Sequence, residues 1–156
     1  MRSPDARSFF VHGLPATQGS KRLVRLRNGR SVMIESSKHL GEWRQSIAVM
    51  ARGAEVPLHE VDVLVSIQAI YLRPESHFKR DGSLRSSAAP RPGYADCDKL
   101  ARAVCDALAG IAYRNDRQVA LLAVERMWAD DEARPGAYIS IAPAPPVGVW
   151  GYWKGA

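Results

Sequence analysis

The feature that most constrains the fold is the segment from residue 61 to 72, VDVLVSIQAIYL, which is dominated by Val and Ile. A run this apolar is unsuited to a surface element and predicts a central β-strand. Three further segments predict strands beside it: SFFVHGLP at 8–15, QVALLAVERMWA at 118–129 and AYISIAPA at 137–144. The chain is therefore expected to form a sheet.

Two helices and a hairpin complete the expected elements. The segment KRLVRLRNGRSVMIES, at 21–36, predicts a hairpin because Asn28-Gly29 suits a type I′ turn. Ser36 or Ser37 can cap a helix that continues to about Ala51, before Gly53. Its expected buried stripe is Leu40, Trp43, Ile47 and Met50. A second apolar stripe predicts a helix that ends near Gly110; its members are Leu100, Val104, Ala107, Leu108 and Ile111.

The order of these elements predicts an α+β fold, a mixed β-sheet with two main helices packed on it. The 156 residues suit a single domain, with a core over about 8–142 and a Pro-rich and aromatic tail at 143–156. No run approaches the roughly 20 apolar residues of a membrane-spanning helix, and the N-terminus lacks a signal-peptide core. We therefore expect a cytoplasmic protein that does not enter a membrane.

Charge indicates the kind of partner. The net charge of +6 favours a polyanion, since Lys and Arg release counterions from phosphate backbones, although many basic proteins bind no nucleic acid. Two runs of cations stand out, one on the hairpin and one in the irregular segment 73–95: Lys21, Arg22, Arg25, Arg27 and Arg30, then Arg73, Lys79, Arg80, Arg85 and Arg91. The alternatives are an edge strand guarded by charge and a solvated loop.

Aspartates gather around the second helix of this basic chain. Asp96 and Asp98 straddle its start, where an acid also serves as an N-cap, and Asp116 lies in the turn after it, where an acid is also common. A helix of about 14 residues, about 21 Å long, separates the pair from Asp116. For Asp116 to share a site with Asp96 and Asp98, a tight turn or a neighbouring subunit has to bring the three residues together.

The string DCDKLAR at 96–102, followed by DAL at 106–108 and NDRQV at 115–119, resembles the D-x-D-N-L-x-K…DAL…D-D-x-Q-V signature of the RusA-like Holliday-junction resolvases. The opening GLPATQGSKR also resembles that family. The resemblance implies a homodimeric endonuclease that depends on Mg²⁺, with Mn²⁺ as a substitute, and cuts branched DNA. It makes Asp96, Asp98 and Asp116 the metal-binding acids.

The same resemblance gives Arg102 the place of a catalytically important lysine. Lys99 stands where the signature has Asn, and it adds a cation to the DNA-binding candidates. Asp106 lies four residues beyond Arg102, so we expect it to orient Arg102 through an ion pair or to be simply solvated. Because of these departures, a catalytically silent branched-DNA-binding protein stays open as an alternative. A second alternative is a structural domain that binds protein, whose basic loops are only solvated.

Overall fold

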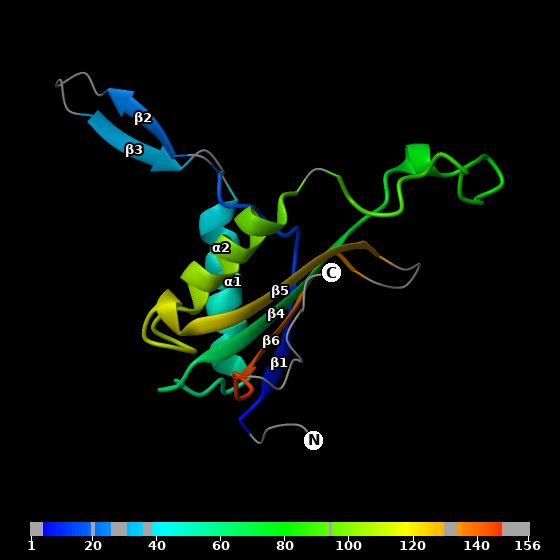
Figure 1. The fold of residues 1–156 in the computed structure, drawn as a ribbon. Helices are drawn as coiled ribbons and strands as arrows, with labels where there is room; N and C mark the ends of the chain where they lie inside the picture. Colours follow the sequence, from blue (N-terminus) through cyan, green and yellow to red (C-terminus); the bar gives the residue numbers. More distant parts are fainter. Residues whose placement is uncertain are drawn as a thin grey trace, which may run out of the picture.

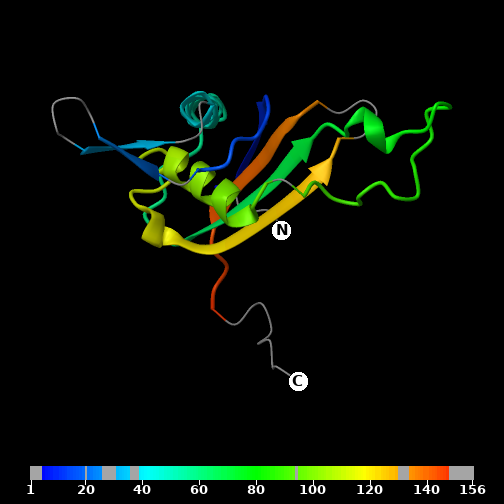
Figure 2. The same ribbon diagram turned by 90° about the horizontal axis from the view of Figure 1, so that it is seen from above.

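The computed structural model describes residues 5–19, 21–25, 31–35, 39–93, 95–129 and 134–147, with side chains described outside 21–25 and 31–35. Within these ranges the chain forms a four-stranded mixed sheet, a separate two-stranded hairpin and two main helices, as predicted. Both helices lie on the same face of the four-stranded sheet (Figures 1 and 2). The α+β prediction is therefore confirmed.

The strand order of the main sheet is β1-β6-β4-β5. β4 (Val63–Tyr71) occupies an interior position, antiparallel to β6 (Gly136–Pro143) and parallel to β5 (Val119–Trp128). β1 (Arg7–His12) pairs antiparallel with β6 at one edge. The Val- and Ile-rich segment is thus the interior strand that its composition predicts, with Val63, Val65 and Ile67 buried beneath the helices.

α1 (Leu40–Gly53) covers the sheet with Leu40, Trp43, Ile47 and Ala51. The prediction that Met50 belongs to this stripe is wrong, because Met50 is 37% exposed and the next residue takes its place. Helical periodicity allows either Met50 or Ala51 to complete the buried stripe, and the smaller Ala51 is the one in contact with the core. The helix follows His39, and the Ser36 and Ser37 candidates for its cap lie outside the described residues.

α2 (Cys97–Leu108) connects two neighbouring parallel strands, β4 and β5, and is their crossover. Its buried face includes Leu100, Val104 and Leu108, which the sequence pattern predicted. Both cysteines of the chain lie on this one helix and are free. The crossover sets the position of the aspartates at its two ends.

Among its described residues, the long segment between β4 and α2 contains one short 3₁₀ helix, η1 (Glu75–His77), and is otherwise irregular, as predicted. Trp128, at the end of β5, holds this segment to the sheet, because its Nε1 donates to the carbonyl of Ala89 at 2.9 Å. The guanidinium of Arg73 lies 5.3 Å from the Trp128 ring centroid and also donates to Ala89 O at 3.1 Å. These contacts fix the two ends of the segment to the sheet, and its middle projects away from the body (Figure 1).

The hairpin consists of β2 (Lys21–Arg25) and β3 (Ser31–Glu35), paired antiparallel. It was predicted from the sequence, although its Asn28-Gly29 turn lies outside the described residues. The hairpin projects from the same end of the body as the long segment, in a different direction (Figures 1 and 2). The helices of the described chain are all too short or too polar to cross a membrane.

Candidate functional site

Asp96 and Asp98 lie at the start of α2, at the end of the body from which the hairpin and the long segment project (Figure 1). Asp96 occupies the N-cap position with an extended backbone, but its side chain makes no capping hydrogen bond. Its carboxylate is 59% exposed, and Asp98 is exposed in the first turn. A structural role as helix cap therefore does not explain Asp96.

Lys99 contacts Asp96 directly, with 2.7 Å between Nζ and Oδ2. The hydrogen bond from Lys99 lowers the pKa of the Asp96 carboxyl, and the pair raises the pKa of the Lys99 ammonium. The positive end of the α2 dipole also favours anionic side chains here. The Asp96 carboxylate thus lies in a setting that favours its ionised form.

Two contacts that sequence reasoning missed hold this acidic turn in place. The guanidinium of Arg126, on β5, donates to the carbonyl of Ala95, the buried residue just before Asp96. The backbone N–H of Gln18 donates to the carbonyl of Lys99 at 3.2 Å. The N-terminal segment after β1 and the last part of β5 therefore position the start of α2, which no local sequence signal indicates.

Arg102 and Asp106 do not pair with each other. Both are exposed on α2, but Asp106 accepts a hydrogen bond from Arg44 of α1, with 2.6 Å between Nη2 and Oδ2. The predicted role of Asp106 in orienting Arg102 is thus corrected: Asp106 joins the two helices, because α1 packs beside it. Within the described part of the chain Arg102 has no hydrogen bond or ion pair, so its guanidinium is available to solvent or a ligand.

Asp116 begins the short 3₁₀ helix η2 (Asp116–Gln118) and is exposed. The turn before it is held by the Gln118 side chain, whose Oε1 accepts from the backbone N–H groups of Arg114 at 2.8 Å and Asn115 at 3.3 Å. Its amide nitrogen donates to the carbonyls of His59 and Val61. The spacing Asn115-x-x-Gln118 is a capping-box pattern, so the sequence did carry a signal for this role of Gln118.

Asp96 and Asp98 lie at the start of α2, whereas Asp116 lies beyond its end. Its 12 residues span about 18 Å, and the start of β5, which follows Asp116, lies at the far end of the sheet from the start of α2 (Figure 1). Among the described residues, no three His, Cys, Asp or Glu side chains gather in a way that could hold a metal ion. A three-aspartate metal site is therefore not formed by one chain alone.

The basic residues of the long segment differ in their contacts. Arg85 donates through Nε to Phe78 O at 3.0 Å, and Arg91 pairs with Glu125 at 3.0 Å. Arg73 is the anchor on Trp128 described above. Lys79 and Arg80 are exposed, and their side chains have no hydrogen bond or ion pair with the described residues. The side chains of Lys21 and Arg22 lie outside the description.

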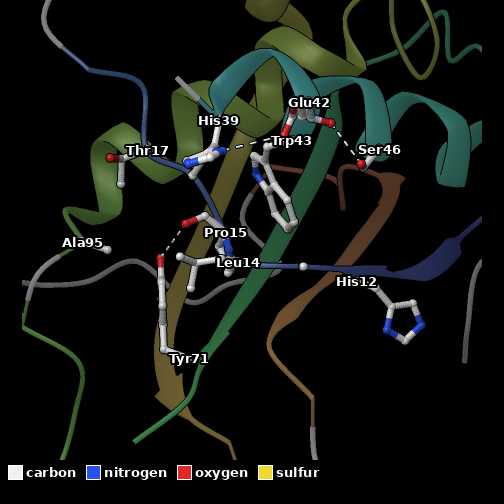
Figure 3. Close-up of a pocket in the computed structure, with 12 residues that line it drawn as sticks. His12, Leu14, Pro15, Thr17, His39, Glu42, Trp43, Ser46, Tyr71 and Ala95 are labelled. Atoms are coloured by element: carbon white, nitrogen blue, oxygen red, sulfur yellow. Dashed lines mark hydrogen bonds and ion pairs between the residues drawn. The ribbon is translucent and has the colours of Figure 1, made fainter. Parts of the chain in front are cut away.

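A pocket of about 530 Å³ opens beside the acidic turn (Figure 3). It is bordered by residues 12–17, the first part of α1, Tyr71 and Ala95. Two of its polar side chains already pair, His39 with Glu42 at 3.7 Å between Nδ1 and Oε2. Neither Asp96 nor Asp98 lines it, so the pocket and the carboxylates are neighbouring but separate features.

Exposed carboxylates beside two projecting segments of basic sequence, on an α+β sheet domain, suit the class of proteins that act on nucleic acid. Comparison with protein families is more specific: the model of endodeoxyribonuclease RusA matches residues 13–142. The chain belongs to the RusA endodeoxyribonuclease family, as its aspartate motifs suggested. Membership implies Holliday-junction-resolving endonuclease activity. A search among curated proteins found no match to the chain.

Proposed function

We propose that this protein is a Mg²⁺-dependent endonuclease that works as a homodimer and resolves Holliday junctions or related branched DNA, with Mn²⁺ able to replace Mg²⁺. The observation that carries the proposal is the exposed Asp96 and Asp98 pair at the end of the body from which both basic segments project (Figure 1). Carboxylates are the ligands that Mg²⁺ prefers in proteins. When bound, Mg²⁺ supplies a nucleophilic water and neutralises charge on the phosphate.

The residues of the chain have separate roles in this proposal. Asp96 and Asp98 supply two of the metal-binding carboxylates, and Asp116 supplies the third. Arg102, exposed four residues after Asp98 on the same side of α2, binds the phosphate next to the scissile bond. The basic segments bind phosphates further from the cut and orient the junction without reading its sequence.

A second candidate function rests on the contact between Lys99 and Asp96. Lys99 stands where the family signature has Asn, and its ammonium competes with a metal ion for the Asp96 carboxylate. Arg102 also differs from the family lysine, since a planar guanidinium is not a point-like ammonium. These two residues favour a branched-DNA-binding protein without cleavage activity.

Cleavage of a synthetic four-way junction, with Mg²⁺, with Mn²⁺ and with EDTA, separates the two candidates. The endonuclease is expected to nick only with metal, and Asp98→Asn is expected to remove cleavage while leaving binding intact or stronger, since a charge that repels phosphates is lost. Glu42→Gln, an exposed acid on α1, is the matched control and should cut normally. Tight binding by the wild type with no nicking under any metal would establish the silent candidate.

A further inference from the structure

Arg126 lies on the face of β5 that α2 covers. Val124 and Trp128, two residues before and after it, pack in the apolar clusters between the helices and the sheet, and side chains two apart in a strand share a face. The β4 residue level with Arg126 is Ala69, which is buried and small. The long side chain of Arg126 is therefore directed toward α2 over a small neighbour, and it is half-buried there.

The guanidinium of Arg126 ends at the acidic turn. Its Nη1 donates to the carbonyl of Ala95, a buried residue. Across one peptide bond, the Cα atoms of Ala95 and Asp96 are about 3.8 Å apart. The pKa of the Asp96 carboxyl is lowered mainly by the hydrogen bond from Lys99, and the positive charge of Arg126 lowers it further. A strand thus fixes a cation beside carboxylates that a helix carries.

Arg126 forms no ion pair in the described part of the chain. Lys99 already occupies Asp96, and Glu125, the neighbour of Arg126 on β5, pairs with Arg91. The hydrogen bond to the turn uses one of the five N–H donors of the guanidinium. Among the described residues, the buried polar atoms that lack a partner include none of Arg126, so its other donors reach solvent. A guanidinium that is held at one corner and open at the others is suited to binding an anion.

We propose that Arg126 is a further catalytic residue, whose open N–H donors bind a non-bridging oxygen of the phosphate that is cut. This inference rests on the proposed function. Arg126 lies outside the aspartate motifs, which end at Val119, so the signature assigns it no role. Its bond to the turn before Asp96 fixes the guanidinium before DNA arrives. A donor fixed in advance stabilises the reacting phosphate more than it strengthens binding.

The salt dependence of binding tests the phosphate contact without metal or cleavage. On a labelled four-way junction in EDTA, Arg126→Gln should reduce the slope of log affinity against log salt by about 0.9, the share of one phosphate. Arg126→Lys should retain the slope. The matched control is Arg52→Gln, which removes an exposed cation at the other end of the body and should also retain the slope (Figure 1). A residue that only held the turn would leave the slope unchanged in Arg126→Gln, and that result would overturn the proposal.

The rate of cleavage tests the catalytic role. With saturating enzyme and Mg²⁺, Arg126→Gln should nick the junction about 100-fold more slowly than the wild type, and Arg126→Lys should recover part of this loss. The half-saturating Mg²⁺ concentration should stay close to the wild-type value, since the carboxylates that bind the metal are unchanged. If Arg126 only positioned Asp96, the half-saturating concentration would rise and excess Mg²⁺ would restore the rate, which contradicts the proposal.

Urea unfolding shows whether each variant is folded. If Arg126→Gln does not fold, Arg126→Lys decides: an unchanged slope with nicking about tenfold slower is expected, and nicking at the wild-type rate would count against a catalytic role. If the wild type binds the junction but cuts it with no metal, the proposed endonuclease function fails, while a reduced slope in Arg126→Gln still establishes the phosphate contact.

Discussion

Lys79 and Arg80 are predicted to contribute phosphate contacts that the salt dependence of binding can count. Their side chains are exposed near the tip of the long segment, where a turn holds them in place. Ser83 donates to Asp81 Oδ1 through its backbone N–H at 2.9 Å and its hydroxyl at 2.7 Å, which lowers the pKa of the Asp81 carboxyl. Gly82 completes the turn with φ of +82°. Substitution of the two cations leaves these contacts unchanged.

Each phosphate contact to duplex DNA contributes about 0.9 to the slope of log affinity against log salt, so Lys79→Ala with Arg80→Ala should reduce the slope by about 1.8. Between 50 and 200 mM salt, the wild type should then lose about twelvefold more affinity than the double variant. The measurement is fluorescence anisotropy with a labelled four-way junction in EDTA, which prevents cutting.

Two controls separate charge from shape. Arg80→Lys retains the charge and should retain the slope. Arg52→Ala removes an exposed cation from the last turn of α1, at the other end of the body, and should also leave the slope unchanged (Figure 1). An unaltered slope in the double variant would refute the reasoning and place the DNA on another surface.

Three further predictions concern contacts around the acids. Lys99→Asn removes the competitor at Asp96 and should lower the half-saturating Mg²⁺ concentration for nicking by about two- to fivefold; an unchanged metal titration would contradict this. Gln118→Ala removes the four hydrogen bonds that hold the turn before Asp116 and should lower the free energy of unfolding in urea by about 2–4 kcal/mol, with a loss under 1 kcal/mol counting against it. Burial lowers the pKa of His59 from 6.5. Below pH 6.5 the unfolded chain thus binds a proton that the folded chain does not. The free energy of unfolding should therefore decrease as the pH is lowered below 6.5, by up to about 1.4 kcal/mol per pH unit. Comparison of wild type and His59→Gln in urea at pH 7.5 and 5.5 checks this, since the variant should lack that part of the loss.

The elements of the fold could be predicted because their signals are local. The composition of β4, the hairpin turn residues and the periodicity of α2 each act over a few neighbouring residues. The parallel pairing of β4 and β5 then follows from the crossover between them. The prediction of Met50 where Ala51 is the buried residue shows the limit of this reasoning. Periodicity defines the face of a helix, and packing decides which residue at the border of that face is buried.

The contacts of individual charged residues could not be predicted in the same way. Asp106 was expected to pair along its own helix, and it pairs instead with Arg44 because α1 packs beside α2. Arg73 was assigned to DNA by its charge alone, yet its guanidinium lies over Trp128, a residue distant in the sequence. A charged side chain has several partners within reach, and only the packing of separate elements decides among them.

The family motif likewise does not show where its residues lie in the fold. Its aspartates appear as one signature because they lie within 21 residues of the chain, from Asp96 to Asp116. In the fold, α2 lies between them, so Asp98 and Asp116 lie at opposite ends of the sheet. Residues that form one signature in the sequence therefore need not be neighbours in the folded chain. The separation of Asp116 from Asp98 is thus a property of the fold that the signature does not reveal, because α2 and the parallel strand β5 place the two residues at opposite ends of the sheet.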